Sequence, residues 1–233
     1  MSAQIFTPSR RGFMAAGLAG TALVSLGRPM FGQTAIPTLA EYVPAVFSPD
    51  EWVFVQAATS RLIPSEGDGP GALEAHVPEF IDRQLGGDFG AGADWYMQGP
   101  HDPAADPLLG FQSPLPPAQI YRDGIRAFDD WCRKTKGTAF AELDALQQDE
   151  ALTALEAGDA GLPDQLRDFF AIMLQNTKEG YFSDPRYGGN HGMSAWVHIG
   201  FPGARASFLE WNDPATDNVA YPLGPVSIAG DRA

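Results

Sequence analysis

The sequence predicts a mainly α-helical protein: a single irregular domain of about five helices, with long Gly/Pro-rich loops and an extended C-terminal arm. Two helix-start patterns favour this fold class, Ser48 followed by Glu51 and Asp144 followed by Gln147, because a capping side chain is followed three residues later by Glu or Gln. Apolar residues then recur at intervals of three and four, and no stretch shows the sustained alternation typical of strands. The 26 glycines and 20 prolines indicate long loops between the helices.

Length, charge and cysteine content restrict the classes of function. A chain of 233 residues suits one sizeable domain. Its formal charge of -14 at pH 7 argues against nucleic acid as a partner, since phosphates require a basic surface. Cys132 is the only cysteine in the sequence, so the chain can form no internal disulfide and no thiolate cluster for zinc or iron–sulfur. We therefore expect protein partners, and we expect any metal or cluster to belong to another chain.

Residues 1–35 have the pattern of a twin-arginine export signal. Arg10 and Arg11 precede an apolar run that ends at Leu26 and is followed by Arg28, which is the order of such leaders. The run is too short to span a bilayer. The alternative interpretation is a short helix in which two arginines are adjacent by chance. The mature chain, residues 36–233, is then expected in the periplasm as one domain without a membrane span of its own.

Two helices are predicted at the start of the mature chain. The first begins at Pro49, behind the Ser48 cap, and ends before Pro64. The second covers residues 73–85, and Pro78 is expected to kink it or to restart it after Val77. The acidic, Gly-rich turn between the two helices lacks the alternating ligands of a calcium loop, so we interpret it as a turn only.

Residues 86–117 are predicted to form a long ordered loop, with a brief helical turn at residues 93–97. Within this loop His101 is interpreted as an exposed turn residue. A third helix follows over residues 117–134, with Gly137 as its stop.

Two further helices complete the predicted domain. The fourth helix covers about residues 144–157 and stops at Gly158. The fifth begins at Pro163 and is expected to end at Gly180, so that it delivers the chain directly into the next segment.

Residues 181–204, which we call the signature loop, combine five glycines with five large aromatic side chains. The glycines permit backbone angles that other residues avoid, while the aromatic rings carry more apolar area than a solvated loop leaves in water. Asp184 and Arg186 are close enough in sequence to pair across the Pro185 turn. We therefore predict an ordered loop that forms a partner interface. The predicted interface residues are Tyr181, Phe182, Asp184, Arg186, Tyr187, Asn190, His191, Trp196 and Phe201.

The segment EGYFSDPRYGGNHGMSAWVHIGFPGA resembles the C-terminal signature of the gluconate 2-dehydrogenase subunit 3 family, and RLIPSEGDGPGALEAHVPEFID, residues 61–82, resembles its N-terminal half. The resemblance implies a small subunit of a periplasmic complex that oxidises sugars, sugar acids or polyols and is associated with the inner membrane. It implies an FAD-dependent large subunit as partner, which often lacks a leader, with electrons passing to a cytochrome c subunit or to quinone. An iron–sulfur cluster or haem c would then lie elsewhere in the complex. One departure is His191, where a basic residue, commonly Arg, is expected; if the position pairs with a partner carboxylate, its charge becomes pH-dependent.

The sequence contains few motifs of the kind that bind cofactors or carry out catalysis. The chain has no GxGxxG after a predicted strand, no P-loop and no CxxCH, so we expect it to bind no cofactor itself. One alternative remains open, a free-standing periplasmic enzyme that uses Asp184, His191 and His198 as metal ligands or as an acid/base set. Their spacing matches no metalloprotease-like motif. The interpretation we favour is a non-catalytic subunit that binds a flavoprotein dehydrogenase and carries it, folded, through the twin-arginine route.

Overall fold

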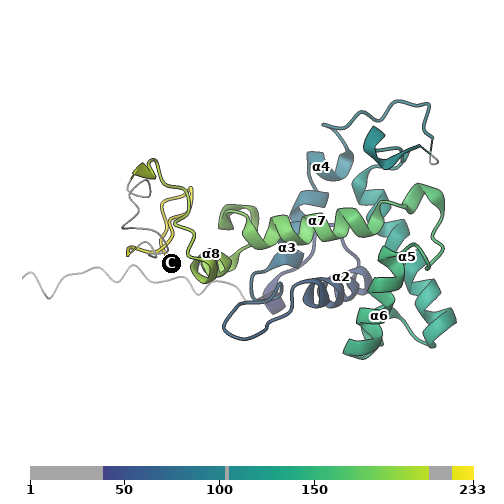
Figure 1. Ribbon diagram of the computed structural model, residues 1–233, viewed down its shortest axis with the longest axis horizontal. Coiled ribbons are helices and arrows are strands. Elements are labelled where there is room, and N and C mark those ends of the chain that lie inside the picture. Colours follow the sequence, from purple (N-terminus) through teal and green to yellow (C-terminus); the bar gives the residue numbers. More distant parts are fainter. Residues whose placement is uncertain (1–38, 103–104, 210–221) are drawn as a thin grey trace, which may run out of the picture. The chain divides into compact units, whose positions relative to one another are not determined.

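The computed structural model describes residues 39–102, 105–209 and 222–233, so the leader with Arg10 and Arg11 lies outside the described residues. Residues 39–233 form one compact unit, and the described part is mainly helical without a sheet, which confirms the predicted fold class (Figure 1). Its α-helices are α2 (Pro49–Leu62), α3 (Val77–Leu85), α4 (Asp88–Ala91), α5 (Pro117–Lys136), α6 (Ala145–Glu156), α7 (Phe169–Phe182) and α8 (Ser194–Ile199). Single 3-10 turns are η1 (Leu39–Glu41), η2 (Pro107–Leu109), η3 (Phe140–Glu142), η4 (Asp164–Leu166), η5 (Pro185–Tyr187) and η6 (His191–Met193).

Local capping sets where the longer helices begin and end. Both predicted capping boxes form: the Ser48 hydroxyl accepts from the Glu51 amide at the start of α2, and the Asp144 carboxylate accepts from the Gln147 amide at the start of α6. Gly137 ends α5 in the left-handed conformation, with φ of 94°, which a residue without a Cβ adopts at no steric cost. Among the described residues, no helix combines the length and the apolar character that crossing a membrane would require.

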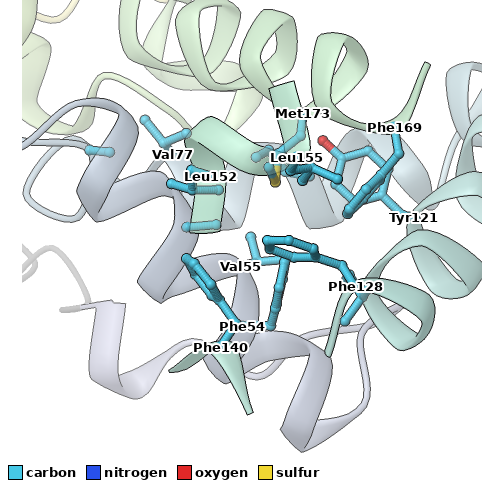
Figure 2. Close-up of a cluster of buried hydrophobic side chains, with 14 of the residues drawn as sticks. Phe54, Val55, Val77, Tyr121, Phe128, Phe140, Leu152, Leu155, Phe169 and Met173 are labelled. Atoms are coloured by element: carbon cyan, nitrogen blue, oxygen red, sulfur yellow. The ribbon is translucent and has the colours of Figure 1, made fainter. Parts of the chain in front are cut away.

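An aromatic cluster holds α2, α5, η3 and α7 together (Figure 2). The Phe54 ring lies 5.1 Å from the Phe140 ring and 6.1 Å from the Phe128 ring, measured between centroids, and the second pair meets edge to face. Tyr121 meets Phe169 edge to face at 5.9 Å. Such geometries add to the stabilisation that comes from burying apolar area. The cluster therefore fixes α7, the helix that leads into the signature loop.

Two glycines allow close approach of aromatic rings to helix backbone. A Cβ at Gly124 in α5 would lie 2.5 Å from the Phe169 ring, and one at Gly180 in α7 would lie 2.8 Å from the Phe80 ring of α3. Gly180 therefore does not end the helix, as the sequence had suggested; α7 continues to Phe182. Because Gly180 has no side chain, α7 and α3 can pack closely at this point, and the two helices lie side by side in Figure 1.

Two short helices differ from the sequence-based expectation. The helical turn expected at residues 93–97 is displaced to α4, because Gly92 adopts the left-handed conformation (φ 67°) and ends it. The signature loop contains α8 and two 3-10 turns where an irregular loop was expected.

The fifth predicted helix starts later than Pro163: η4 comes first, and α7 begins at Phe169.

The chain ahead of α2 is anchored on one buried carboxylate. Asp82 in α3 is fully buried and accepts hydrogen bonds from the Tyr42 hydroxyl and from the backbone N–H groups of Ala45, Val46 and Phe47. Burial, and then the hydrogen bond to Asp82, raise the pKa of Tyr42 above its ordinary value. The start of the described chain is thus fixed to α3.

Candidate docking surface

The signature loop is a rigid structure built from short elements. After α7 the chain forms η5, then η6, and then α8, which lies beyond the C-terminal end of α7 in Figure 1. Gly188 adopts φ of 99°, and a Cβ on Gly189 would clash with the carbonyl oxygen of Gly180. These positions therefore require glycine because the loop folds tightly back against α7.

Asn190 ties the two halves of the loop together. Its side chain is fully buried, and its Nδ2 donates to the Ser183 carbonyl oxygen at 2.9 Å while its Oδ1 accepts from the Ala195 amide at 3.0 Å. Its backbone is left-handed with φ of 45°, a conformation that Asn tolerates better than most residues. The structure thus places this predicted interface residue inside the loop.

Asp184 holds the C-terminal segment against the loop. Its buried carboxylate accepts from the Arg186 amide at 3.1 Å and from the Ile228 amide at 2.7 Å. The side-chain pair with Arg186 that the sequence suggested is not formed; the Arg186 guanidinium lies over the Tyr187 ring instead, 5.4 Å from its centroid. The carboxylate therefore acts as a backbone acceptor.

The described part of the expected C-terminal arm is folded back onto the loop. Gly203 and Val226 form an isolated parallel bridge, and Val226 also pairs with Arg232. The Ala204 amide donates to the Val226 carbonyl oxygen at 2.7 Å. Residues 222–233 thereby form part of the same surface as the signature loop.

Two of the aromatic residues predicted at the interface are internal. Trp196 is 6% exposed, and its indole N–H donates to the Phe182 carbonyl oxygen at 2.9 Å. Tyr181 is equally buried, and its hydroxyl donates to the Pro70 carbonyl oxygen at 2.7 Å. Both side chains are covered by the chain itself and stabilise the loop.

Several large apolar side chains of the signature loop and of the end of α7 remain exposed. Phe182, Tyr187 and Phe201 are 47%, 45% and 40% exposed, and the Phe201 ring meets the Trp196 ring edge to face at 5.1 Å. Val197 and Ile199 on α8 are also exposed; neither was predicted at the interface, because α8 is too short to show an apolar period in the sequence. We call the five exposed residues the docking surface: Phe182, Tyr187, Val197, Ile199 and Phe201.

Charge is distributed unevenly between the helical body and this end of the chain. Residues 39–180 contain 9 basic and 24 acidic residues, a formal charge of −15. Residues 181–233 contain 3 basic and 5 acidic residues, a formal charge of −2. Exposed apolar side chains on a nearly neutral surface are typical of protein interfaces, whose centres are depleted of charge.

The candidate acid/base residues have separate environments. Asp184 binds backbone amides, and the exposed His198 ring lies against Gly69, where a Cβ would come within 2.9 Å of Nε2. The His191 ring stacks on the His76 ring at 3.8 Å between centroids. In the described residues, no hydrogen bond or ring contact joins any two of Asp184, His191 and His198, and no cluster of three or more His, Cys, Asp or Glu suitable for a metal ion occurs.

Cys132 is a core residue in the described structure. Its side chain is fully buried, and burial raises the pKa of its thiol to about 12. A thiol with that pKa remains protonated near neutral pH and is a poor nucleophile.

A separate groove of about 550 Å³ lies between α7 and the loop that follows α4. The rings of Phe89, Trp95 and Phe111 line one side of it, and Ile172 and Gln175 of α7 line the other. None of the signature-loop residues lines this groove. It is therefore a different feature from the docking surface.

Comparison with known proteins gives one family. The family model described as gluconate 2-dehydrogenase subunit 3 matches residues 49–203, a range that runs from the first residue of α2 through the docking surface. No curated protein and no solved structure matches the chain. The matched range covers well over half of the sequence and contains every element that builds the docking surface. The chain belongs to the gluconate 2-dehydrogenase subunit 3 family, and so is a subunit of a multi-subunit dehydrogenase complex.

Proposed function

We propose that this chain is the non-catalytic small subunit of a periplasmic FAD-dependent sugar, sugar-acid or polyol dehydrogenase. In this role it binds the flavoprotein subunit in the cytoplasm, supports its folding and assembly, and carries it through the twin-arginine export route. A cytochrome c subunit or quinone then takes the electrons. FAD belongs to the partner, and any haem or iron–sulfur cluster belongs to other chains of the complex.

The observation that carries this proposal is the docking surface. Five large apolar side chains are exposed at the end of α7 and in the signature loop, whose backbone is held by hydrogen bonds from the buried side chains of Asn190 and Trp196. Exposing several large apolar side chains to water is unfavourable for a protein that acts alone. In a subunit of a complex, the partner covers these side chains. The framework beneath it is preorganised, which lowers the entropic cost of association.

Export of the complex rests on Arg10 and Arg11, with no acidic residue before Glu41. Changing both arginines to lysine should leave this chain and its flavoprotein partner in the cytoplasm, since the paired arginines are the receptor-read part of the signal. The measurement is flavin-linked dehydrogenase activity in periplasmic and cytoplasmic fractions of the native host. A single Arg28→Lys change serves as the matched control and should leave export intact. Arrival of the flavoprotein in the periplasm of the double variant would show that this subunit does not carry it.

A further inference from the structure

His76 and His191 join the signature loop to the start of α3. The two rings are stacked with centroids 3.8 Å apart and planes inclined by 15°. The His191 amide donates to the Ala75 carbonyl oxygen at 3.1 Å. His76 precedes α3 in the left-handed conformation, with φ of 55°, and its Nδ1 lies 3.1 Å from Glu79 Oε2. A carboxylate only accepts, so that nitrogen carries a hydrogen.

The surroundings of the His191 ring disfavour its charged form. Burial, and then the neighbouring His76 ring, lower the pKa of His191 below its ordinary value of 6.5, while Glu79 opposes them. His76 and Glu79 are the titratable groups that face the ring, and Glu79 is also paired with Arg83 on the far side. The Glu79 carboxylate thus already binds both His76 and Arg83. Its negative charge therefore does little to stabilise a positive charge on a protonated His191.

The backbone beside His191 is held in conformations that need support. Asn190, Gly192 and Met193 have φ of 45°, 61° and 57°, and for Met193 the left-handed region is strained. Such strain persists only where surrounding contacts fix the conformation. Here the contacts on either side are the Asn190 hydrogen bonds and the stacked rings. Weakening the stack therefore removes one of the restraints that hold the turn leading into α8.

We propose that the stacked His76–His191 pair is a proton-sensitive clasp: it holds the signature loop against α3 while the His191 ring is neutral, and it opens when His191 is protonated. Opening would loosen the elements that display Val197 and Phe201 and so weaken docking at low pH. This consequence for docking rests on the proposed function, whereas the clasp itself is a property of this chain alone.

The sign of the effect follows from linkage between protons and structure. Because the closed form lowers the pKa of His191 from 6.5, the open form binds more protons at pH values between the two pKa values. The clasp is therefore fully effective above pH 6.5 and weakens as the pH falls toward and through the lowered pKa.

The test uses the full chain, with NMR titration of its four histidines and hydrogen exchange of the His191 backbone amide. We expect His191 to titrate below 6.5, and we expect its amide, after correction for the intrinsic rate, to exchange faster at about pH 5 than at about pH 7.5, because protonation of His191 favours the open form.

Two matched variants show whether the pH dependence of amide exchange comes from the His76–His191 pair or from a general loss of stability in acid. His191→Phe keeps a planar ring without a proton and should make the exchange independent of pH. His76→Asn supplies a residue that tolerates the left-handed conformation and removes the neighbouring ring, so it should raise the His191 pKa and reduce the pH dependence. Equal acid sensitivity in the His191→Phe variant, or a His191 titration unmoved by His76→Asn, would overturn the proposal. Flavoprotein capture by the chain at about pH 7.5 is measured separately, so a failure of docking is distinguishable from a failure of the clasp.

Discussion

Replacing Asp82 with alanine should lower the free energy of unfolding by about 3 kcal/mol or more, because the change leaves several buried donors without an acceptor. The Asp82 carboxylate accepts from the Tyr42 hydroxyl at 2.8 Å and from three consecutive amides, at 2.8 Å from Ala45, 3.0 Å from Val46 and 3.1 Å from Phe47. Hydrogen bonds to charged groups are stronger than neutral ones. Loss of the acceptor would also release the chain that leads into α2.

Urea unfolding followed by circular dichroism measures this effect. Asp130 provides the control, because it is exposed and its carboxylate forms a surface ion pair with Arg133; Asp130→Ala should cost less than about 0.5 kcal/mol. Tyr42→Phe removes a single donor and should cost about 1 kcal/mol. An Asp82→Ala protein that unfolds at the same urea concentration as the Asp130→Ala protein would refute the anchoring role.

Trp196→Ala should cost about 3 to 5 kcal/mol, the usual range for removing a large aromatic side chain from a core. The indole is 6% exposed, donates to the Phe182 carbonyl oxygen and packs edge to face on Phe201. Its removal leaves a cavity under the docking surface and an unpaired carbonyl group. The loop should then lose hydrogen-exchange protection before the helical body does.

Phe201→Ala is the control for Trp196→Ala, because it truncates an exposed aromatic side chain instead of a buried one. Phe201 is 40% exposed, so its truncation removes mainly surface area and should cost about 1 kcal/mol. Hydrogen exchange resolved by segment measures both variants against the unchanged chain. If both variants retained full protection of residues 188–199, the buried indole would not be what fixes the loop.

Features that depend on a few neighbouring residues could be predicted from the sequence. The capping boxes at Ser48 and Asp144 and the glycine stop at Gly137 occur where expected, because each depends on side chains within one helical turn. α4 and α8 were missed because four and six residues are too few to show an apolar period. Gly180 was misread as a stop because its function, admitting the Phe80 ring, involves a residue distant in sequence.

The sequence singled out the signature loop as a candidate interface but did not give its internal arrangement. Composition showed that the aromatic rings of the signature loop require cover, yet it could not tell which rings the chain covers itself. The structure buries Tyr181 and Trp196 and exposes Phe182, Tyr187 and Phe201. The sequence also gave no sign that the His191 ring would lie against His76, because stacking of rings from distant segments follows from the packing of α3 against α7 and the signature loop.

The central claim is that this subunit binds the flavoprotein through the docking surface and takes no part in turnover. The direct measurement is flavin absorbance and turnover per flavin in gel-filtered complexes that carry Phe201→Asp, with Leu109→Asp in η2, whose side chain is also exposed, as the matched control. Loss of a buried anchor costs about 2 kcal/mol or more, which weakens binding about 30-fold. We expect the Phe201→Asp chain to retain little flavoprotein, the complexes that do assemble to turn over normally, and the Leu109→Asp chain to behave as the unchanged one. Stoichiometric, flavin-loaded Phe201→Asp complexes, whether fully active or with turnover reduced by orders of magnitude, would contradict the account.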